Sequence, residues 1–434
     1  MTISIDAKPH LLPVGRPSFL KQMEKINTEV DAVLAIRLTN FDRIQDLLGY
    51  EAAQDILYFM QEIIKRTAPQ SQSRVARVAE STFALPLTQL QNEGHAKLAA
   101  MKFIRLAEEP FVWHDHNILA KFAVGISKVK NKSGDASEKL RQAELGLSTA
   151  VVSKEKFAVY TDIVSDQITR YWQLEDQLHR AIEMDEMELH YQPKIDIQHD
   201  RVYGAEALIR WHSSKFGQVF PDEFISIAEE SGQIADMSRW VLKTAFRDAE
   251  NWSRFQQGVS VAINISASVL KDPDFLYYVE SAAAIWGMPL ERCTIEITES
   301  ELMCNPESTI AILEKLKEKN IRISIDDFGT GYSSLAYLKD IPADEIKIDK
   351  SFVLGMAEDL GKREIVRTII ALSHSLGYKV VAEGVEDLTT LEILHLQGCD
   401  IVQGYYFAKA LPKKFFYPWL EDWKSLDKWI ELHS

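Results

Sequence analysis

The sequence lacks several features that would assign it to a familiar class of protein. It has three cysteines (Cys293, Cys304 and Cys399), an odd and sparse number that excludes a disulfide framework and a zinc site built from several cysteines. No apolar run approaches the roughly 18 residues that a membrane-spanning helix needs, so we expect no membrane span. The stretch Met1 to Pro17 contains prolines and no sustained apolar core, which argues against a signal peptide. We therefore expect a cytoplasmic protein.

Positive charge is also scarce. The chain carries 49 Lys and Arg residues against 64 Asp and Glu residues, a formal net charge of −15. Because contacts with phosphate backbones need clustered cations, this balance argues against a nucleic-acid polymer as a partner. Hydrophobic residues (46%) and charged residues (26%) occur in ordinary globular proportions, and a length of 434 residues predicts two domains or more. The acidic excess is compatible with a metal site.

The first half of the chain, residues 1–165, alternates strand and helix patterns, which predicts an α/β sandwich. It shows no Gly-rich phosphate loop and no cluster of metal-binding residues. The charged stretch 166–186 has apolar residues at near-helical spacing and predicts a connecting helix, with a short coiled coil as the less favoured alternative. The expected elements are a strand at 32–36, a helix at 51–66, a hairpin at 74–87, a helix at 94–106, a strand at 118–129, a helix at 135–153 and a short strand near Phe157.

The second half, residues 174–434, repeats apolar runs and helical stretches in a way that is typical of a (β/α)₈ barrel. The first two runs are separated only by residues 198–201. A parallel crossover needs a dozen or more residues, so these two strands must form an antiparallel hairpin. We predict a TIM-like barrel with one antiparallel strand. The expected strands are Leu189–Ile195, Val202–Ile209, Val259–Ile265, Cys293–Ile297, Ile321–Ile325, Glu345–Ile348, Lys379–Val381 and Asp400–Val402.

Polar residues lie within or directly after most of these runs, toward the strand ends where barrel enzymes place their active sites. Most are carboxylates with apolar neighbours, and ionised groups are costly to bury unless they are paired or bound to a metal. With Lys347 as the one lysine among them, the acids cannot neutralise each other, and oxygen ligands suit Mg²⁺ or Mn²⁺ rather than zinc. Scattered surface acids are the disfavoured alternative. The residues are Glu206, Asn264, Glu296, Asp326, Asp327, Lys347, Glu383 and Gln403.

Asp326 and Asp327 are adjacent in the chain. Consecutive strand residues point to opposite sides, so we expect Asp327 to lie just past the strand end. Adjacent aspartates there can flank two ions, and two ions can clamp the attacking and leaving oxygens of a phosphoryl displacement. Lys347 can hold a phosphate oxygen or the attacking water, or be a counter-ion. The loop 328–334 predicts a mobile segment over the metals, or an ordinary strand-to-helix turn. Arg210 can pair with a phosphate or form a surface ion pair.

From about residue 174 to residue 412 the sequence resembles the EAL family of cyclic di-GMP phosphodiesterases. Eight segments match the family in the same order and with suitable gaps. Together they identify the family far more specifically than the motif Glu206-Ala207-Leu208 alone. The resemblance implies a barrel whose first strand is antiparallel, and cleavage of one phosphodiester of cyclic di-GMP to give linear pGpG with Mg²⁺ or Mn²⁺. The segments are Tyr191–Lys194, Glu206–Leu208 with Arg210, Asn264–Ser266, Glu296–Glu299, Asp326–Gly331, Lys347–Asp349, Glu383–Glu386 and Gln403–Tyr405.

The same resemblance implies roles for individual residues. Lys347 resembles the residue that orients or deprotonates the water, and with Glu206 and Glu383 it forms the implied catalytic set. Glu299 resembles the glutamate that anchors the mobile loop. The implied metal ligands are Glu206, Asn264, Glu296, Asp326, Asp327 and Glu383. The implied substrate contacts, direct or supporting, are Gln192, Leu208, Arg210, Glu386 and Gln403.

The first half resembles the GGDEF diguanylate cyclase domain in a degenerate form. Its hairpin tip reads Ala79-Glu80-Ser81-Thr82-Phe83, where the family has Gly-Gly-Asp/Glu-Glu-Phe. Glycines there let the backbone approach the GTP phosphates, whereas alanine and glutamate add a Cβ and a negative charge. The family's metal carboxylates map onto Arg37 and Ser81, and its inhibitory Arg-x-x-Asp motif maps onto residues 70–73, where it is absent. We predict no cyclase activity and a regulatory or dimerising role, with GTP sensing as an alternative.

Two alternatives to an active phosphodiesterase stay open. One is a catalytically silent cyclic di-GMP receptor that signals through protein contacts, as degenerate family members do. The complete carboxylate set argues against it. The other is a barrel phosphodiesterase that acts on a different nucleotide. By analogy with the family we also expect a homodimer.

Overall fold

The computed structural model describes residues 15–25, 30–68, 74–90, 92–108, 110–114, 116–129, 136–153, 155–254, 258–304, 306–330 and 338–433. The chain divides into two compact units, residues 1–173 and 174–434. The helix α5 (Asp162–Ala181) runs across this boundary, beginning and ending some residues earlier than the predicted stretch 166–186. Within the described ranges, no helix has the length and apolar character needed to cross a membrane.

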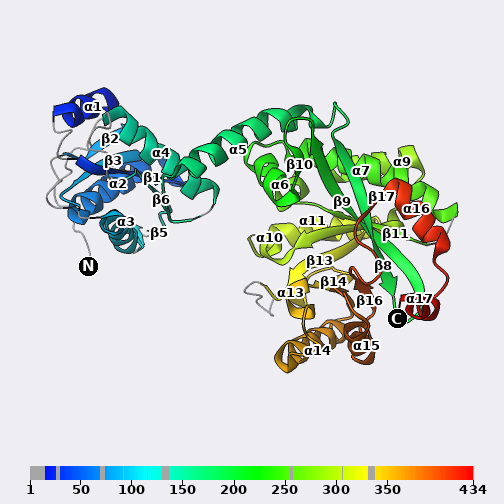
Figure 1. Cartoon of the computed structure of the whole chain (residues 1–434). Coiled ribbons are helices and arrows are strands. Elements are labelled where there is room, and N and C mark those ends of the chain that lie inside the picture. Colours follow the sequence, from blue (N-terminus) through cyan, green and yellow to red (C-terminus); the bar gives the residue numbers. More distant parts are fainter. Residues whose placement is uncertain are drawn as a thin grey trace. The chain divides into compact units, whose positions relative to one another are not determined.

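Unit 1 is built on a five-stranded sheet with the strand order β2-β3-β1-β6-β7 (Figure 1). A separate two-stranded pair, β4 and β5, lies outside this sheet. The predicted hairpin at 74–87 corresponds to β2 and β3, which pair antiparallel. The elements are α1 (Arg16–Lys25), β1 (Val30–Leu38), α2 (Phe41–Thr67), β2 (Ala76–Ala79), β3 (Thr82–Thr88), α3 (Glu93–Ala107), β4 (Phe111–Trp113), β5 (His116–Ile118), β6 (Phe122–Ile126), α4 (Ala136–Val152) and β7 (Phe157–Val159).

The central strand β1 has a core on each face. Leu34 and Ile36 belong to a buried cluster with residues of α2 and α3, whereas Val33 and Ala35 belong to a second cluster with residues of α1 and α4. This alternation follows from the period of two in a strand, and it confirms the predicted α/β sandwich. The single strand predicted at 118–129 is wrong, because β5 ends at residue 118 and pairs with β4, and β6 begins at residue 122.

Unit 2 is a closed barrel (Figure 1). Its strands form a ring of eight in the order β9-β11-β12-β13-β14-β15-β16-β8, and the pairing of β8 with β9 closes it. The strands are β8 (Met187–Asp196), β9 (Arg201–Ser213), β10 (Gly217–Val219), β11 (Ser260–Asn264), β12 (Cys293–Thr298), β13 (Arg322–Phe328), β14 (Glu345–Ile348), β15 (Lys379–Glu383), β16 (Ile401–Gln403) and β17 (Leu411–Pro412). The pairs β10 with β9 and β17 with β8 extend the sheet beyond the ring.

The strand β8 is the reversed one. It pairs antiparallel with both neighbours, β9 and β16, while the other neighbouring strands of the ring pair parallel. The short turn 197–200 leaves no room for a crossover, so the predicted fold class is confirmed. The helical elements are α6 (Pro221–Glu230), α7 (Ile234–Glu250), η3 (Asn251–Arg254), α8 (Ala267–Leu270), α9 (Phe275–Trp286), η4 (Leu290–Arg292), α10 (Glu299–Cys304), α11 (Pro306–Glu318), α13 (Lys350–Val353), α14 (Leu360–Ser375), α15 (Leu388–Leu396), α16 (Lys413–Asp422) and α17 (Leu426–His433).

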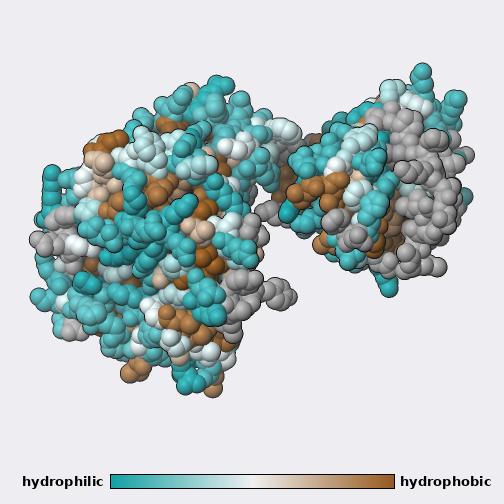
Figure 2. All heavy atoms as spheres, turned by 180° about the vertical axis from the view of Figure 1, so that it is seen from behind, coloured by the Kyte–Doolittle hydropathy of each residue, from teal (hydrophilic) through white to brown (hydrophobic). Residues whose placement is uncertain are grey.

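The surface of both units is mainly hydrophilic on the face that Figure 2 shows, with separate hydrophobic patches. The apolar residues of the barrel strands are buried instead, for example Ile263 and Ile295 on neighbouring strands. The buried charged residues of the barrel, such as Glu296 and Lys347, therefore have mainly apolar neighbours along their strands.

Candidate active site

The parallel register of the barrel brings the strand-end polar residues to one rim. Asn264 of β11 is the register partner of Glu296 on β12, and Glu383 of β15 is the partner of Gln403 on β16. Asp326 of β13 pairs with Thr298, two residues beyond Glu296. Because these residues stand at the carboxyl ends of their strands or within two residues of them, side chains far apart in the sequence converge there.

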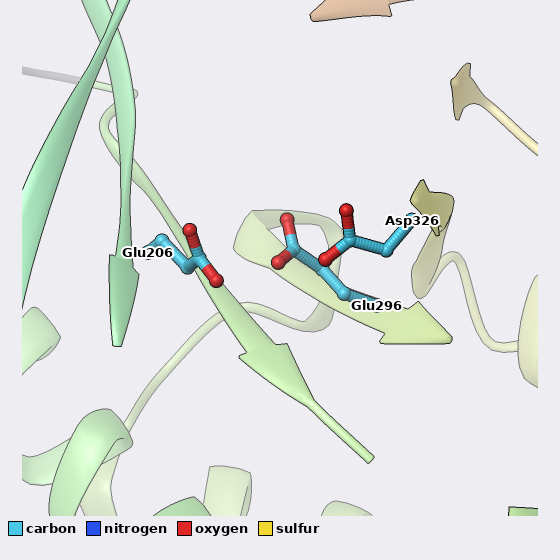
Figure 3. A group of neighbouring side chains, drawn as sticks. All are labelled: Glu206, Glu296 and Asp326. Carbon is cyan, nitrogen blue, oxygen red and sulfur yellow. The ribbon is translucent and has the colours of Figure 1, made fainter. Parts of the chain in front are cut away.

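Three carboxylates form the centre of this rim (Figure 3). Glu206, Glu296 and Asp326 each offer one oxygen, and these oxygens all lie within 4.8 Å of one another. All three residues are buried, Glu296 completely. Nearby, the carbonyl oxygen Oε1 of Gln403 is buried without a hydrogen-bond partner. A buried donor set made of oxygens alone fits a hard divalent cation such as Mg²⁺ or Mn²⁺.

Lys347 sits in the middle of the carboxylates. Its Nζ lies 2.8 Å from Asp326 Oδ2, 3.0 Å from Glu296 Oε2, 2.7 Å from Glu383 Oε1 and 3.6 Å from Glu206 Oε2. Burial alone would lower the pKa of this ammonium, but the surrounding carboxylates outweigh burial and raise the pKa well above its usual value. Lys347 is therefore a charged residue held inside the barrel.

A second lysine also reaches the cluster, which corrects the expectation of a single one. Lys194 of β8 forms a buried ion pair with Glu296 Oε1, so an ammonium group contacts each oxygen of that carboxylate. The sequence contains a pattern that predicts this position of Lys194. Gln192 and Lys194 are two residues apart in one strand, so their side chains lie on the same face. Lys194 was overlooked because its strand runs antiparallel and so does not present it at a carboxyl end.

Glu206 differs from Glu296 and Glu383 in the direction of its pKa shift. Burial would raise the pKa of Glu206, but Lys347 and Lys194, helped by hydrogen bonds from Gln403 and Asn264, lower it to about 2. Burial dominates at Glu296, whose pKa rises to about 7 against the opposing effect of the lysines. Burial likewise raises the pKa of Glu383 to about 7. A bound cation would favour the charged form of the last two groups.

Asp327 is exposed, and its position in the strand differs from the predicted one. The strand β13 continues to Phe328, so Asp327 does not lie past its end. Instead the register of β13 with β14 shifts between Ile325 and Phe328, and Asp327 has φ of 54°. This irregularity re-aims the side chain, as β-bulges do. Burial and the neighbouring carboxylates Asp326 and Asp349 raise the pKa of Asp327.

Amide side chains orient Glu206. Asn264 Nδ2 donates to Glu206 Oε1 at 2.7 Å, and Gln403 Nε2 donates to Glu206 Oε2 at 2.7 Å. Gln403 Nε2 also donates to Gln192 Oε1 at 3.0 Å. The predicted residues Gln192, Asn264 and Gln403 are thus brought together around one carboxylate.

The remaining predicted residues surround this centre. Glu299 is buried, and its Oε2 accepts a hydrogen bond of 2.9 Å from the backbone N–H of Gly329, at the start of the expected loop. Residues 331–334 of that loop lie outside the described residues. Leu208 and Arg210 line a cavity of about 400 Å³ that also borders Asn264 and Glu296. Glu386 is exposed in the segment after β15.

At the hairpin tip of unit 1, arginine side chains donate hydrogen bonds to uncharged oxygen atoms. Arg37 of β1 is the register partner of Thr82, and its Nε donates to Thr82 Oγ1 at 3.2 Å. The Arg77 guanidinium donates to the backbone carbonyl of Glu80 at 2.8 Å. The carbonyl of Ser81 accepts from the backbone N–H of Leu38 at 3.1 Å. The stretch 70–73 lies outside the described residues.

The features assembled so far define a (β/α)₈ barrel with an acidic cluster at its rim, and known families share them. The family model of the EAL domain matches residues 175–410, and that of the diguanylate cyclase GGDEF domain matches residues 18–156. The chain therefore belongs to the EAL domain family and carries a GGDEF domain in tandem ahead of the EAL domain. Both family resemblances noted in the sequence are thereby confirmed, while the degeneracy of the GGDEF domain stays a prediction.

Individual relatives match most of this chain, and one solved structure matches about half of it. The cyclic di-GMP phosphodiesterase NbdA of Pseudomonas aeruginosa is 34% identical over 88% of this chain and 49% of its own length. The signaling protein YkoW of Bacillus subtilis is also 34% identical, over 88% of this chain and 48% of its own length. The chain thus spans about half the length of these relatives. The structure of the PaMucR phosphodiesterase in complex with c-di-GMP has a TM-score of 0.54 and 37% identity, and covers 56% of this chain and 99% of its own.

Proposed function

We propose that unit 2 hydrolyses cyclic di-GMP to linear pGpG with two Mg²⁺ or Mn²⁺ ions. The observation that carries the proposal is the convergence of Glu206, Glu296 and Asp326, all buried, around Lys347. The activity in the name of the relative NbdA and the ligand of the PaMucR structure support the choice of substrate.

The side chains divide the work of this reaction among themselves. Glu206, Asn264, Glu296, Asp326, Asp327 and Glu383 would hold the ions, which stabilise charge on the phosphoryl oxygens and activate a water molecule. Lys347 stays charged and orients the water or a phosphate oxygen beside the carboxylates. Glu299 fixes the start of the loop after β13 through Gly329.

A guanine base has a place to bind next to the acids. The cavity of about 400 Å³ between the strand ends and the helices α6 and α7 is lined mainly by apolar residues, including Leu208, Ile225 and Met237. Apolar walls with a few polar groups are typical of pockets for planar ligands. Arg210, half-buried on the same wall, would contact a phosphate, and Gln403 and Glu386 would contact the rest of the dinucleotide.

Unit 1 is proposed to have no cyclase activity. Arg37 and Ser81 stand where the family's metal carboxylates would be, and neither can bind a divalent cation as a carboxylate does. Its proposed role is regulatory or dimerising, within a cytoplasmic homodimer.

The test is to incubate the full chain with cyclic di-GMP and Mg²⁺ or Mn²⁺, and to separate the products by chromatography. We expect pGpG from the wild type and a loss of at least roughly 100-fold in Glu206→Ala, because the carboxylate that Asn264 and Gln403 orient is removed. The matched control Glu358→Ala removes an exposed carboxylate and should retain the rate. Tight binding of cyclic di-GMP without turnover would instead identify a catalytically silent receptor. Hydrolysis of a different nucleotide from a substrate panel would show that cyclic di-GMP is not the substrate.

A further inference from the structure

The C-terminal tail, residues 411–433, lies beyond the residues that the EAL family model matches, yet it packs on the barrel wall. The strand β17 pairs with β8, and α16 lies beside β8 (Figure 1). Lys413 Nζ is 2.6 Å from Asp248 Oδ1, and Asp248 is buried. The Phe416 ring lies 5.5 Å from that of Tyr191, next to Gln192 in the chain. The tail is therefore an integral part of this side of the barrel.

The second half of the tail contacts the loop that follows β16, residues 404–410, here called the β16 loop. Trp429 Nε1 of α17 donates to the backbone carbonyl of Tyr406 at 3.2 Å. The Phe407 ring lies 6.2 Å from the rings of both Trp423 and Trp429, which stack on each other at 5.7 Å. Two indoles and one hydrogen bond thus restrain consecutive residues of the loop.

The opposite side of the same loop contacts the acidic cluster through Gln192. Gln192 Nε2 donates to the carbonyl of Ala408 at 3.2 Å, and Gln192 Oε1 accepts from Gln403 Nε2 at 3.0 Å. Gln403 Nε2 also donates to Glu206 Oε2. Trp429 is therefore connected to Glu206 by these hydrogen bonds and ring contacts together with the backbone of residues 406–408. Tyr405 of the same loop is 58% exposed.

We propose that Trp429 is a positioning residue for the barrel site. It holds the β16 loop, the loop holds Gln192 and Gln403 in register, and these two amides set the orientation of Glu206. The inference rests on the proposed function, whose site it extends to residues outside the family match. Gln192 and Gln403 are also among the proposed substrate contacts, so loosening the β16 loop should weaken the binding of cyclic di-GMP and raise KM more than it lowers kcat.

The experiment compares Trp429→Phe, Trp429→Ala and the matched control Phe415→Ala in the full chain. Phe415 is an aromatic residue of the same tail that is 57% exposed. Trp429→Phe keeps a ring and removes the N–H donor, and we expect KM for cyclic di-GMP to rise roughly five-fold. Trp429→Ala should raise KM roughly ten-fold or more with a smaller change in kcat. Phe415→Ala should retain both constants.

A second readout does not depend on catalysis. In the wild type the backbone N–H of Tyr406 donates to Val385 and those of Phe407 and Ala408 donate to Gly404, so these amides should exchange slowly with deuterium. In Trp429→Ala their exchange should accelerate at least roughly ten-fold while core strands stay protected. Unchanged exchange would overturn the proposal even if the wild type proved inactive on cyclic di-GMP, which by itself would refute only the proposed function.

A double-mutant cycle tests the route through Gln192. If the tail acts through this amide, Trp429→Ala should change KM less than about two-fold in a Gln192→Ala background, because the connection is already broken. An equal effect of Trp429→Ala in both backgrounds would contradict the proposed route, as would faster loop exchange with unchanged KM and kcat.

Discussion

The charged side chains on the β-strands of the two units have opposite partners. In unit 2, buried carboxylates such as Glu206 and Glu296 gather around the ammonium groups of Lys347 and Lys194. In unit 1, Arg37 and Arg77 meet the neutral oxygens of Thr82 and of the Glu80 carbonyl. One arrangement attracts cations, and the other presents cations itself. The difference teaches that a match to a family carries a fold, while the chemistry depends on individual side chains.

The largest expected effect is the loss of the acidic centre of unit 2. Asp326→Asn removes a charge that lies within 4.8 Å of two other carboxylates and contacts Lys347. We expect metal affinity and the rate of cyclic di-GMP hydrolysis to fall together, each by roughly 10- to 100-fold or more. Both depend on the Asp326 carboxylate as a proposed metal ligand. Titration calorimetry and a product assay check this. Near wild-type turnover would show that the metal assignment is wrong.

Next in size is the effect of removing a buried counter-ion. Lys194→Met leaves Glu296 buried with one ammonium fewer, and we expect a loss of about 3 kcal/mol or more in the free energy of unfolding of unit 2. The matched change in unit 1, Lys128→Met, removes one partner of the exposed pair with Asp162 and should leave stability unchanged. Urea denaturation of both variants and the wild type measures these free energies of unfolding. Equal stabilities would mean that the buried pair has no greater effect than the exposed one.

The pH dependence of the metal-free protein is the third test. Glu296 and Glu383 have a pKa of about 7 in the folded chain, above the usual 4.5, because they are buried. The folded state therefore binds protons more tightly than the unfolded state between these values. Stability should fall as the pH rises from about 5 to about 8, by up to roughly 1.4 kcal/mol per pH unit for each group.

The measurement is urea denaturation in EDTA across this pH range. Glu206, whose pKa is lowered to about 2, contributes stability that is lost only on further acidification, so it does not mask the trend. Glu383→Gln removes one titrating group and should make the slope shallower. Stability that increases steadily from pH 5 to pH 8 would contradict the arrangement of charges described for the barrel.

The smallest expected effect concerns unit 1. Ser81→Asp restores a carboxylate at the hairpin tip, but Arg37 still occupies the other metal position of the family. We therefore expect no synthesis of cyclic di-GMP from GTP and Mg²⁺, measured by chromatography with an active cyclase as the positive control. Detectable synthesis would overturn the alignment of Arg37 and Ser81 with the metal positions of the GGDEF family.

Much of unit 2 was predictable because its strands are short, apolar and closed by polar residues. The brief turn at 197–200 was enough to predict the reversed strand β8. Two details of unit 2 were not predicted from the sequence. The bulge at Asp327 depends on the pairing of β13 with β14, which the period of a single strand does not express. Lys194 enters the cluster from the antiparallel strand β8, so the pattern of polar residues at the carboxyl ends of parallel strands does not include it.

Unit 1 was predicted less accurately in its details. Its sandwich class follows from alternating strands and helices. The apolar residues of 118–129 continue across the end of β5 and so predict one strand, where the structure has β5 and β6. The contact of Trp429 with Tyr406 was also beyond sequence reasoning, since it joins two segments without a shared periodic pattern. Local patterns predict elements, whereas contacts between loops depend on the whole fold.

The most direct test of the central claim is titration calorimetry of the full chain with Mg²⁺ and with Mn²⁺, in the presence and absence of cyclic di-GMP. The acidic rim of the barrel predicts uptake of two divalent ions, with affinity lost in Asp326→Asn and retained in Ser81→Asp. Absence of heat from either ion under both conditions would contradict the account, because Glu206, Glu296 and Asp326 would then be no more than counter-ions of two buried lysines.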